Sequence, residues 1–292
     1  MKLIDHNNIL HHTKPRRKRN TTFKYLFLAA TLLSLVVLAI LLVRVLYQGL
    51  PYLDWQFLNS LPSRKAEKAG IYTAFIGTIW MMAVVIPVTF ILGVGTGIYL
   101  EEYAKKNRFN TFLQVNISNL AGVPSVVYGL LGLTIFVRAL HFGTSVLAAG
   151  LTMSLLILPV VIVSSQEAIR AVPKELREAS YAMGATKWQT IRTVVLPAAL
   201  PGILTGAILA FSRGIGETAP LVVIGVPLYL AFLPNSLLDQ FTALPMQIYN
   251  WTSRPQEEFH ALAAAGIIVL LGMLILMNSV AVWIRNKFQR RY

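Results

Sequence analysis

Long apolar runs, almost free of charge, divide the chain into segments of membrane-spanning length. A helix needs about 20 apolar residues to cross the roughly 30 Å hydrocarbon core of a bilayer. The runs do not alternate between apolar and polar residues, as the strands of a closed barrel would. The pattern therefore predicts an all-α polytopic membrane protein with six transmembrane helices. The runs cover residues 25–43, 71–100, 109–137, 142–166, 193–238 and 261–284.

The composition supports this class. Of 292 residues, 55% are hydrophobic and 13% charged, whereas a soluble domain carries about twice that charged fraction. The chain contains no cysteine, which excludes disulfides and thiolate metal sites. The first apolar run is too long for a cleaved signal peptide, and no small-residue cleavage pattern follows it. We expect this run to remain as a membrane anchor.

The net charge of +14 is explained by the position of the basic residues. They lie beside the predicted spans, which favours a positive-inside bias over nucleic-acid binding. If both chain ends lie inside, nineteen lysines and arginines lie on the inner side and five on the outer side. The charges therefore predict cytoplasmic N- and C-termini, a lipid environment and no nucleic-acid partner.

The fifth run, residues 193–238, could form one helix or two that turn at Arg213. Two helices would make seven spans and place the basic C-terminus outside, against the charge bias. Prolines and a glycine after residue 219 also disfavour a straight second helix. We expect one span that begins near Pro201, followed by an irregular outer segment. Arg213 then lies about 18 Å along the helix, close to the bilayer midplane.

Arg213 and Glu217 are the charges that interrupt this run. A charge at the midplane costs about 2.5–3.5 kcal/mol even on the lenient insertion scale. Spaced i, i+4, the two side chains share a helix face and can neutralise each other. The pair could serve only to fix helix packing. Alternatively, Arg213 could meet an anion in a polar pathway, because a guanidinium matches the geometry of oxyanions.

The loop at about 166–197, between the fourth and fifth spans, has helix signals of its own. Pro173 suits a first helical position, and Gly184 is a natural stop just past the helix end. Thr186 and Gln189 form a capping-box pattern that starts a second helix. The apolar stripe of the first helix could dock into a groove on another protein or lie on lipid headgroups. It consists of Leu176, Ala179, Ala182 and Met183.

Other features carry weaker signals. Proline residues 87, 124 and 159 lie inside spans and could kink them or break them beside a cavity. Ser125 follows Pro124 in a polar half-span and is a candidate for lining that cavity, although a hydrogen bond between helices would also explain it. The histidines lack spaced carboxylates, so no metal site is predicted, and no arrangement suggests catalysis. No G-x-x-x-x-G-K-[ST] motif occurs.

Several motifs resemble a known family. The sequence EASYAMG, followed by nine residues and VVLP, resembles the EAA loop of bacterial ABC importer permeases, with Ser180 and Val194 departing mildly from the pattern. RGIGETAPL, AGVPSVVYGLLG and GIYLEEYA resemble the PstA-type permeases of bacterial phosphate importers. The resemblance covers about residues 67–285.

This resemblance implies a fold and a division of the chain. The fold is the type I ABC importer permease fold, in which an N-terminal helix precedes a five-helix core. Residues 1–66 would hold the basic arm, the first helix and an outer loop. Residues 67–292 would hold the permease core and the coupling loop. The location would be the bacterial inner membrane.

The resemblance also implies roles and partners. The helix from Pro173 to Gly184 would be the coupling helix, with Glu178, Ala179 and Gly184 in contact with an ATPase. Arg213 and Glu217 would belong to the phosphate path. The partners would be a PstC-type permease, a PstB-type ATPase dimer and a PstS-type phosphate-binding protein. ATP and Mg²⁺ would bind the ATPase, so this chain would be non-catalytic and hold no cofactor.

Other functions remain open at this point. The chain could be a permease for another oxyanion or solute, or the sister PstC-type subunit, since that subunit shares the RxIGET element. An ion-coupled secondary carrier would predict inverted repeats, and no convincing repeat is visible. A purely structural or regulatory membrane subunit would use the Arg–Glu pair only for packing.

Overall fold

The computed structural model describes residues 6–105 and 107–288. Four of the basic residues expected on the inner side lie outside these ranges: Lys2, Lys106, Arg290 and Arg291. The tertiary contacts divide the chain after Gln48 into two units. Each unit is described by itself.

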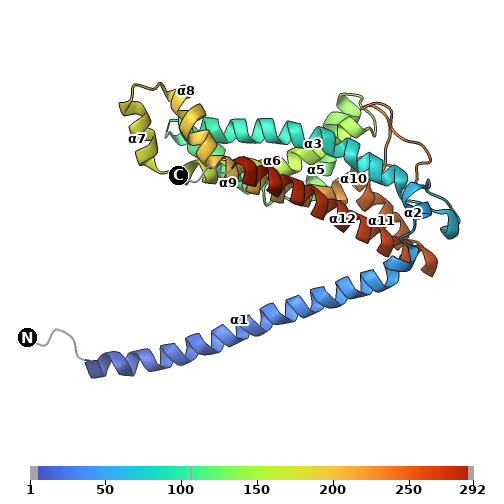
Figure 1. The fold of residues 1–292 in the computed structure, drawn as a ribbon, viewed down its shortest axis with the longest axis horizontal. Coiled ribbons are helices and arrows are strands. Elements are labelled where there is room, and N and C mark those ends of the chain that lie inside the picture. The colour runs from blue at the N-terminus through green and yellow to red at the C-terminus, as the bar shows by residue number, and fades with distance from the viewer. Residues whose placement is uncertain (1–5, 106, 289–292) are drawn as a thin grey trace, which may run out of the picture. The chain divides into compact units, whose positions relative to one another are not determined.

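The first unit is formed by one helix, α1 (His6–Gly49), which ends at the unit boundary (Figure 1). The side chains from Arg19 to Val43 are exposed, although most of them are apolar. A helix that is apolar on all sides suits a lipid environment. The predicted first span is therefore confirmed as a long apolar helix.

The regular elements in the described residues of the second unit are all helices, and the only strand-like pairing there is a single bridge between Ser145 and Gln240. Its long helices are α3 (Tyr72–Ile98), α6 (Val146–Arg170), α9 (Leu196–Gly216) and α12 (Glu257–Phe288). The shorter helices are α2 (Trp55–Asn59), α4 (Arg108–Leu120), α5 (Ser125–Gly132), α7 (Lys174–Ala182), α8 (Lys187–Thr190), α10 (Ala219–Ile224) and α11 (Leu244–Thr252). Helices α7 and α8 lie at one end of the bundle, and α2 and α11 at the other (Figure 1).

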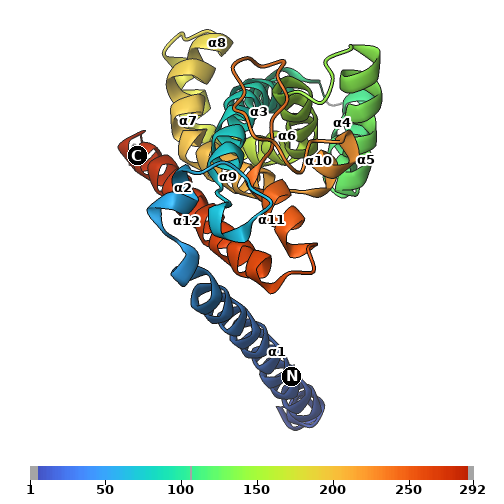
Figure 2. The same cartoon turned by 90° about the vertical axis from the view of Figure 1, so that its right-hand side faces the viewer.

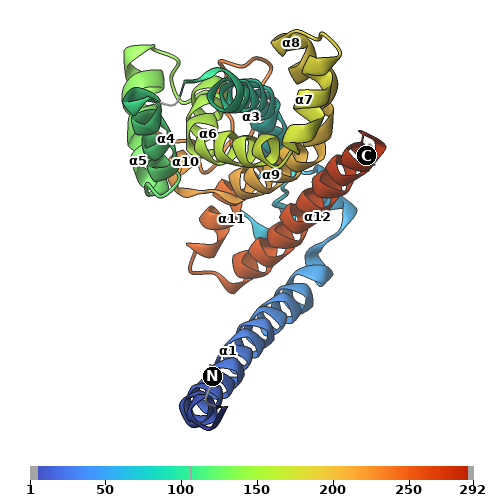
Figure 3. The same cartoon turned by 90° about the vertical axis from the view of Figure 1, so that its left-hand side faces the viewer.

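The core of the bundle lies where α6 packs between α3 and α9 (Figures 2 and 3). Met81, Ile157 and Ile203, one from each helix, are fully buried there. Small residues let the backbones approach closely: Gly93 and Gly97 of α3 face α6, and a side chain at either position would overlap Val161 or Ser165. The apolar runs thus form a tightly packed helical bundle.

The third apolar run is not one straight span. Helix α4 ends at Leu120, and α5 begins at Ser125 after a turn that ends in Pro124. A π-helical segment, Leu133–Ala139, continues α5, and the two halves are bent by 104°. The described residues therefore contain five helices of spanning length, and six spans if the bent pair counts as one. Pro124 disfavours helical geometry at the residue before it, which explains the break.

The fifth apolar run also differs from the expectation. The span does not begin near Pro201 but at Lys187, since α8, the π-helical segment Ile191–Val195 and α9 form one helical stretch. The helix ends at Gly216, and α10 follows it after Glu217 and Thr218. One span followed by an irregular segment is thus confirmed, with an earlier start than predicted.

A second apolar cluster lies at the α11 end of the bundle. Its fully or nearly fully buried residues include Phe57, Ile71 and Trp251.

The long connection between α10 and α11 is held by Asp239, whose carboxylate accepts the backbone N–H groups of Asn235 and Ser236. These bonds hold the pKa of the Asp239 carboxyl below its ordinary value. The segment without regular structure is therefore fixed by local hydrogen bonds.

Gly132→Ala is expected to destabilise the bundle by about 1–3 kcal/mol. A methyl group at this position would overlap the Thr152 side chain of α6, which is completely buried and β-branched. Gly95→Ala is the matched control, because no atom lies within 4 Å of the added methyl group. The midpoint of thermal unfolding in detergent, followed by tryptophan fluorescence, compares the two variants. Equal midpoints would contradict the close packing of α5 on α6.

Candidate substrate path and coupling loop

Arg213 and Glu217 form an ion pair at the end of α9. The Nε atom of Arg213 lies 3.3 Å from Oε1 of Glu217. The Arg213 side chain is 51% exposed in the isolated chain and that of Glu217 is 20% exposed. The predicted contact is confirmed, and it lies at the surface of the single subunit.

The two residues do not share a helix face as expected. Arg213 lies in the last turn of α9, whereas Glu217 follows the helix end with extended backbone angles. Gly214 and Gly216 weaken the helix at this point, because glycine is a poor helix former. The contact therefore depends on the turn between α9 and α10. The position of Arg213 near the bilayer midplane stays a prediction.

Arg213 belongs to an exposed stripe of α9. Thr205, Leu209, Arg213 and Gly216 are exposed, whereas Phe211 and Ile215 are buried on the opposite face. In the part of the chain that the structure describes, only Glu217 accepts a hydrogen bond from the guanidinium. Both Nη groups of Arg213 are thus available as donors for another partner.

Ser125 is half-buried at the first position of α5, directly after the break in the third span. Among the described residues no hydrogen bond joins it to Arg213. The sequence did not single out Tyr128, one turn further along α5, which is buried. Its hydroxyl donates to the Leu120 carbonyl at 2.8 Å and so ties α5 to the end of α4. The broken span packs against the segment that follows Arg213 and Glu217, since α5 contacts α10.

The coupling loop is an elbow made of α7 and α8. Pro173 is not the first helical residue as predicted but precedes it, with φ −56° and ψ 140°. After α7, the N–H of Gly184 donates to the Tyr181 carbonyl, and that of Ala185 to the Ser180 carbonyl. This pair of bonds is the Schellman motif, which requires a left-handed residue at Gly184. The observed φ of +82° confirms the predicted glycine stop.

The second half of the elbow begins as predicted. The Thr186 hydroxyl accepts the N–H of Gln189, and the Gln189 side chain accepts the N–H of Thr186. The Ser180 and Thr190 hydroxyls share a hydrogen bond of 2.9 Å across the elbow. Local sequence signals thus define the elbow, and one side-chain bond closes it.

The outer surface of the elbow is exposed and partly apolar. The predicted stripe is divided: Leu176 packs against the bundle, whereas Ala179, Ala182 and Met183 point outward. The Met183 side chain is 88% exposed. Glu178 is exposed beside Ala179, so the acidic and small residues of the motif lie on one accessible surface. Such a surface suits a groove on another protein.

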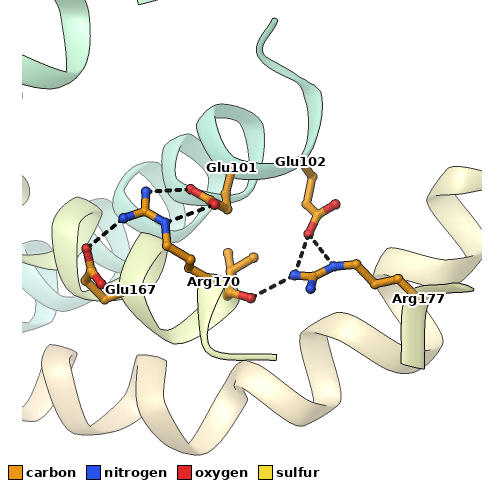
Figure 4. Close-up of polar contacts among 6 residues, drawn as sticks. Glu101, Glu102, Glu167, Arg170 and Arg177 are labelled. Atoms are coloured by element: carbon orange, nitrogen blue, oxygen red, sulfur yellow. Dashed lines mark hydrogen bonds and ion pairs between the residues drawn. The ribbon is translucent and has the colours of Figure 1, made fainter. Parts of the chain in front are cut away.

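Two acidic residues of the GIYLEEYA motif have partners that the sequence does not predict. Glu101 pairs with Arg170 at the end of α6, and Glu102 pairs with Arg177 in α7 (Figure 4). The partners are 69 and 75 residues away. Periodicity cannot reveal pairs at such separations.

These features define a class of protein. A bundle of apolar helices carries an exposed elbow at one end and an arginine with free donors on one face. Within the described residues no three histidine, aspartate or glutamate side chains gather as metal ligands. The arrangement is that of the transmembrane subunit of a transport complex.

Comparisons with known proteins agree with this class. Residues 90–292 match the family model of the binding-protein-dependent transport system inner membrane component. The chain is 37% identical to the phosphate transport system permease protein PstA of Mycobacterium leprae, over 82% of this chain and 80% of the relative. It is 32% identical to PstA of Yersinia pestis, over 91% and 90%, and 31% identical to the probable ABC transporter permease protein YqgI of Bacillus subtilis, over 85% and 88%.

Solved structures show the same fold. A chain of a bacterial alginate ABC transporter, crystallised with an alginate-bound periplasmic protein, aligns with a TM-score of 0.67 at 14% identity, covering 92% of this chain and 96% of the other. A chain of the MetNI methionine ABC transporter aligns with a TM-score of 0.61 at 18% identity, covering 75% and 98%. The fold is therefore the type I ABC importer permease fold.

The chain belongs to the binding-protein-dependent transport permeases and, within them, to the PstA-type permeases. It is a multi-pass inner membrane protein.

Proposed function

We propose that this chain is the transmembrane permease subunit of an ATP-driven importer of inorganic phosphate. Relatives that are named as phosphate transport permeases match most of its length. The observation that supports phosphate as the substrate is Arg213: its Nη groups make no hydrogen bond with the described residues and lie on an exposed face of α9. A planar guanidinium suits the oxygen atoms of phosphate.

The substrate path lies along that exposed face. A second permease subunit of the PstC type would cover it, so that phosphate passes between the two subunits. The ion pair with Glu217 lowers the positive potential at Arg213. Phosphate therefore binds only transiently, as a transport site requires. Ser125 and the broken third span would line the same path.

The elbow is the coupling element. Glu178, Ala179 and Gly184 would lie against one subunit of a PstB-type ATPase dimer, which binds ATP and Mg²⁺, while this chain holds neither. ATP binding would close the ATPase dimer and move α7, and the bundle would open toward a PstS-type phosphate-binding protein. The alginate transporter crystallised with its periplasmic protein supports a binding-protein partner. The positive-inside bias supports a cytoplasmic location for both termini and for the elbow.

The family membership argues against an ion-coupled carrier and leaves the identity of the solute to experiment.

Proteoliposomes that contain the chain, its partner permease and the ATPase should accumulate radiolabelled phosphate only with ATP and the binding protein. An excess of sulfate should not compete. Preference for sulfate or another solute would overturn the proposed substrate, and uptake without ATP would overturn the coupling to an ATPase.

A further inference from the structure

The end of α3 contacts each element of the elbow region. A π-helical segment, Tyr99–Tyr103, extends α3 and contains Glu101 and Glu102. Glu101 pairs with Arg170 of α6, and Glu102 with Arg177 of α7 (Figure 4). The Lys187 ammonium group of α8 lies 5.0 Å from the centre of the Tyr103 ring. Three consecutive side chains of one helix end thus contact three later elements.

The two ion pairs differ in burial. The side chains of Arg170 and Glu101 are 53% and 20% exposed, whereas those of Arg177 and Glu102 are 16% and 9% exposed. Water and salt weaken an exposed pair. Removing one partner of a buried pair leaves the other charge uncompensated. The pair between Glu102 and Arg177 is therefore the stronger connection.

Arg177 is held in one orientation by four bonds. Its Nε and Nη2 atoms lie 3.3 and 3.1 Å from Oε1 of Glu102. Its Nη1 donates to the Val172 carbonyl at 2.7 Å, and Nη2 also donates to the Ile169 carbonyl at 2.8 Å. These carbonyls lie at the end of α6 and just after it. One guanidinium thus joins α7, the end of α6 and the end of α3.

The contact between Glu102 and Arg177, called the joint below, has a mechanical consequence. The main chain connects α7 directly to α6 on one side and to α8 on the other, so α3 is linked to α7 only through the helices between them. We propose that the pair of Glu102 and Arg177 transmits the motion of the coupling helix to α3, which makes both residues positioning residues for coupled transport. The inference rests on the proposed function, because it assumes that an ATPase moves α7.

Glu102→Gln tests the joint, and Glu101→Gln is the matched control on the neighbouring, more exposed pair. In proteoliposomes of the full complex, Glu102→Gln should lower phosphate uptake per ATP hydrolysed about tenfold, a typical size for coupling between sites. The rate of ATP hydrolysis and the amount of co-purified ATPase should stay within about twofold, as should all three quantities for Glu101→Gln. Unchanged uptake per ATP in Glu102→Gln, or uptake that falls only in proportion to assembled complex, would overturn the proposal.

If the Glu102→Gln complex does not assemble, a variant in which positions 102 and 177 are cross-linked still tests the proposal. The chain has no cysteine, so Glu102→Cys with Arg177→Cys introduces the only two thiols of this subunit. A short bis-thiosulfonate reagent that bridges them should restore uptake per ATP, and a reductant should abolish it again. If the bridged protein assembles but remains uncoupled, or if the unbridged double variant is fully coupled, the joint is refuted.

A distance measurement separates this proposal from the identity of the substrate. Spin labels at Lys174, the first residue of α7 and not one of those placed against the ATPase, and at Ile91 of α3, both exposed, report how the two helices move relative to each other. We expect the distance distribution to stay narrow in the wild-type complex on addition of ATP and to broaden with Glu102→Gln. Equal distributions in both proteins would refute the joint. A wild-type complex that imports no phosphate would refute the proposed substrate and leave this comparison valid.

Discussion

Arg213→Gln is expected to abolish ATP-dependent phosphate uptake, to less than about 1% of wild type, while the complex still assembles. The loss of a charged hydrogen bond to an anion in a poorly hydrated site costs about 3 kcal/mol or more, which corresponds to a factor of about a hundred. The variant keeps a polar but uncharged side chain at an exposed position. The measurement is uptake of radiolabelled phosphate into proteoliposomes with equal amounts of complex.

Two further variants show what the guanidinium supplies. Arg213→Lys keeps the charge but loses the planar fork, so it should retain part of the uptake. Arg285→Gln is the control at a second arginine beside α9, because Arg285 donates to the Thr205 hydroxyl of the same exposed stripe. This control should transport within about twofold of wild type, as expected for a surface polar contact. Normal uptake by Arg213→Gln would show that Arg213 only packs in the interface.

The helical content and the class of protein could be predicted from the sequence because apolar length is a local property. The elbow was predicted in detail for the same reason. Thr186 and Gln189 lie three residues apart, and Gly184 acts through its own backbone angle. Neither depends on the rest of the fold.

The bend between α4 and α5 could not be predicted from local sequence signals. Hydropathy shows that residues 109–137 are apolar, but it does not show in which direction the helix axes run. The bend is stabilised by contacts with distant residues, since Gly129 packs against Pro220 and Gly132 against Thr152. Pro124 indicated a possible break, but the tertiary packing determines its angle.

The candidate site was predicted in part. The contact between Arg213 and Glu217 follows from their short spacing, but the helical geometry assumed for it fails because α9 ends between them. Glu101 and Glu102 were not predicted as partners of Arg170 and Arg177, because the paired residues are 69 and 75 positions apart in the sequence. Their roles depend on how the helices pack, which a single sequence does not show.

Gly184→Val should uncouple ATP hydrolysis from transport. A φ of +82° places Gly184 in the left-handed region, which a β-branched residue rarely adopts. No atom lies within 4 Å of an added Cβ, so a steric clash with neighbouring residues does not contribute. The free-energy cost of the left-handed conformation for valine, about 1–2 kcal/mol or more, therefore destabilises the turn itself. It favours a different path of the chain between α7 and α8. Phosphate uptake per ATP should fall at least about tenfold, because α7 would no longer meet the ATPase in its native position.

Gly184→Asn is the control that isolates the backbone requirement. Asparagine tolerates the left-handed conformation and often replaces glycine at this position of a helix end. It adds a side chain of nearly the same size as valine, so it should keep most of the coupling if the turn alone matters. Equal loss in both variants would mean that any side chain here blocks contact with the ATPase. Full coupling in Gly184→Val would show that the elbow does not transmit the motion, because the Schellman turn at Gly184 would then be dispensable.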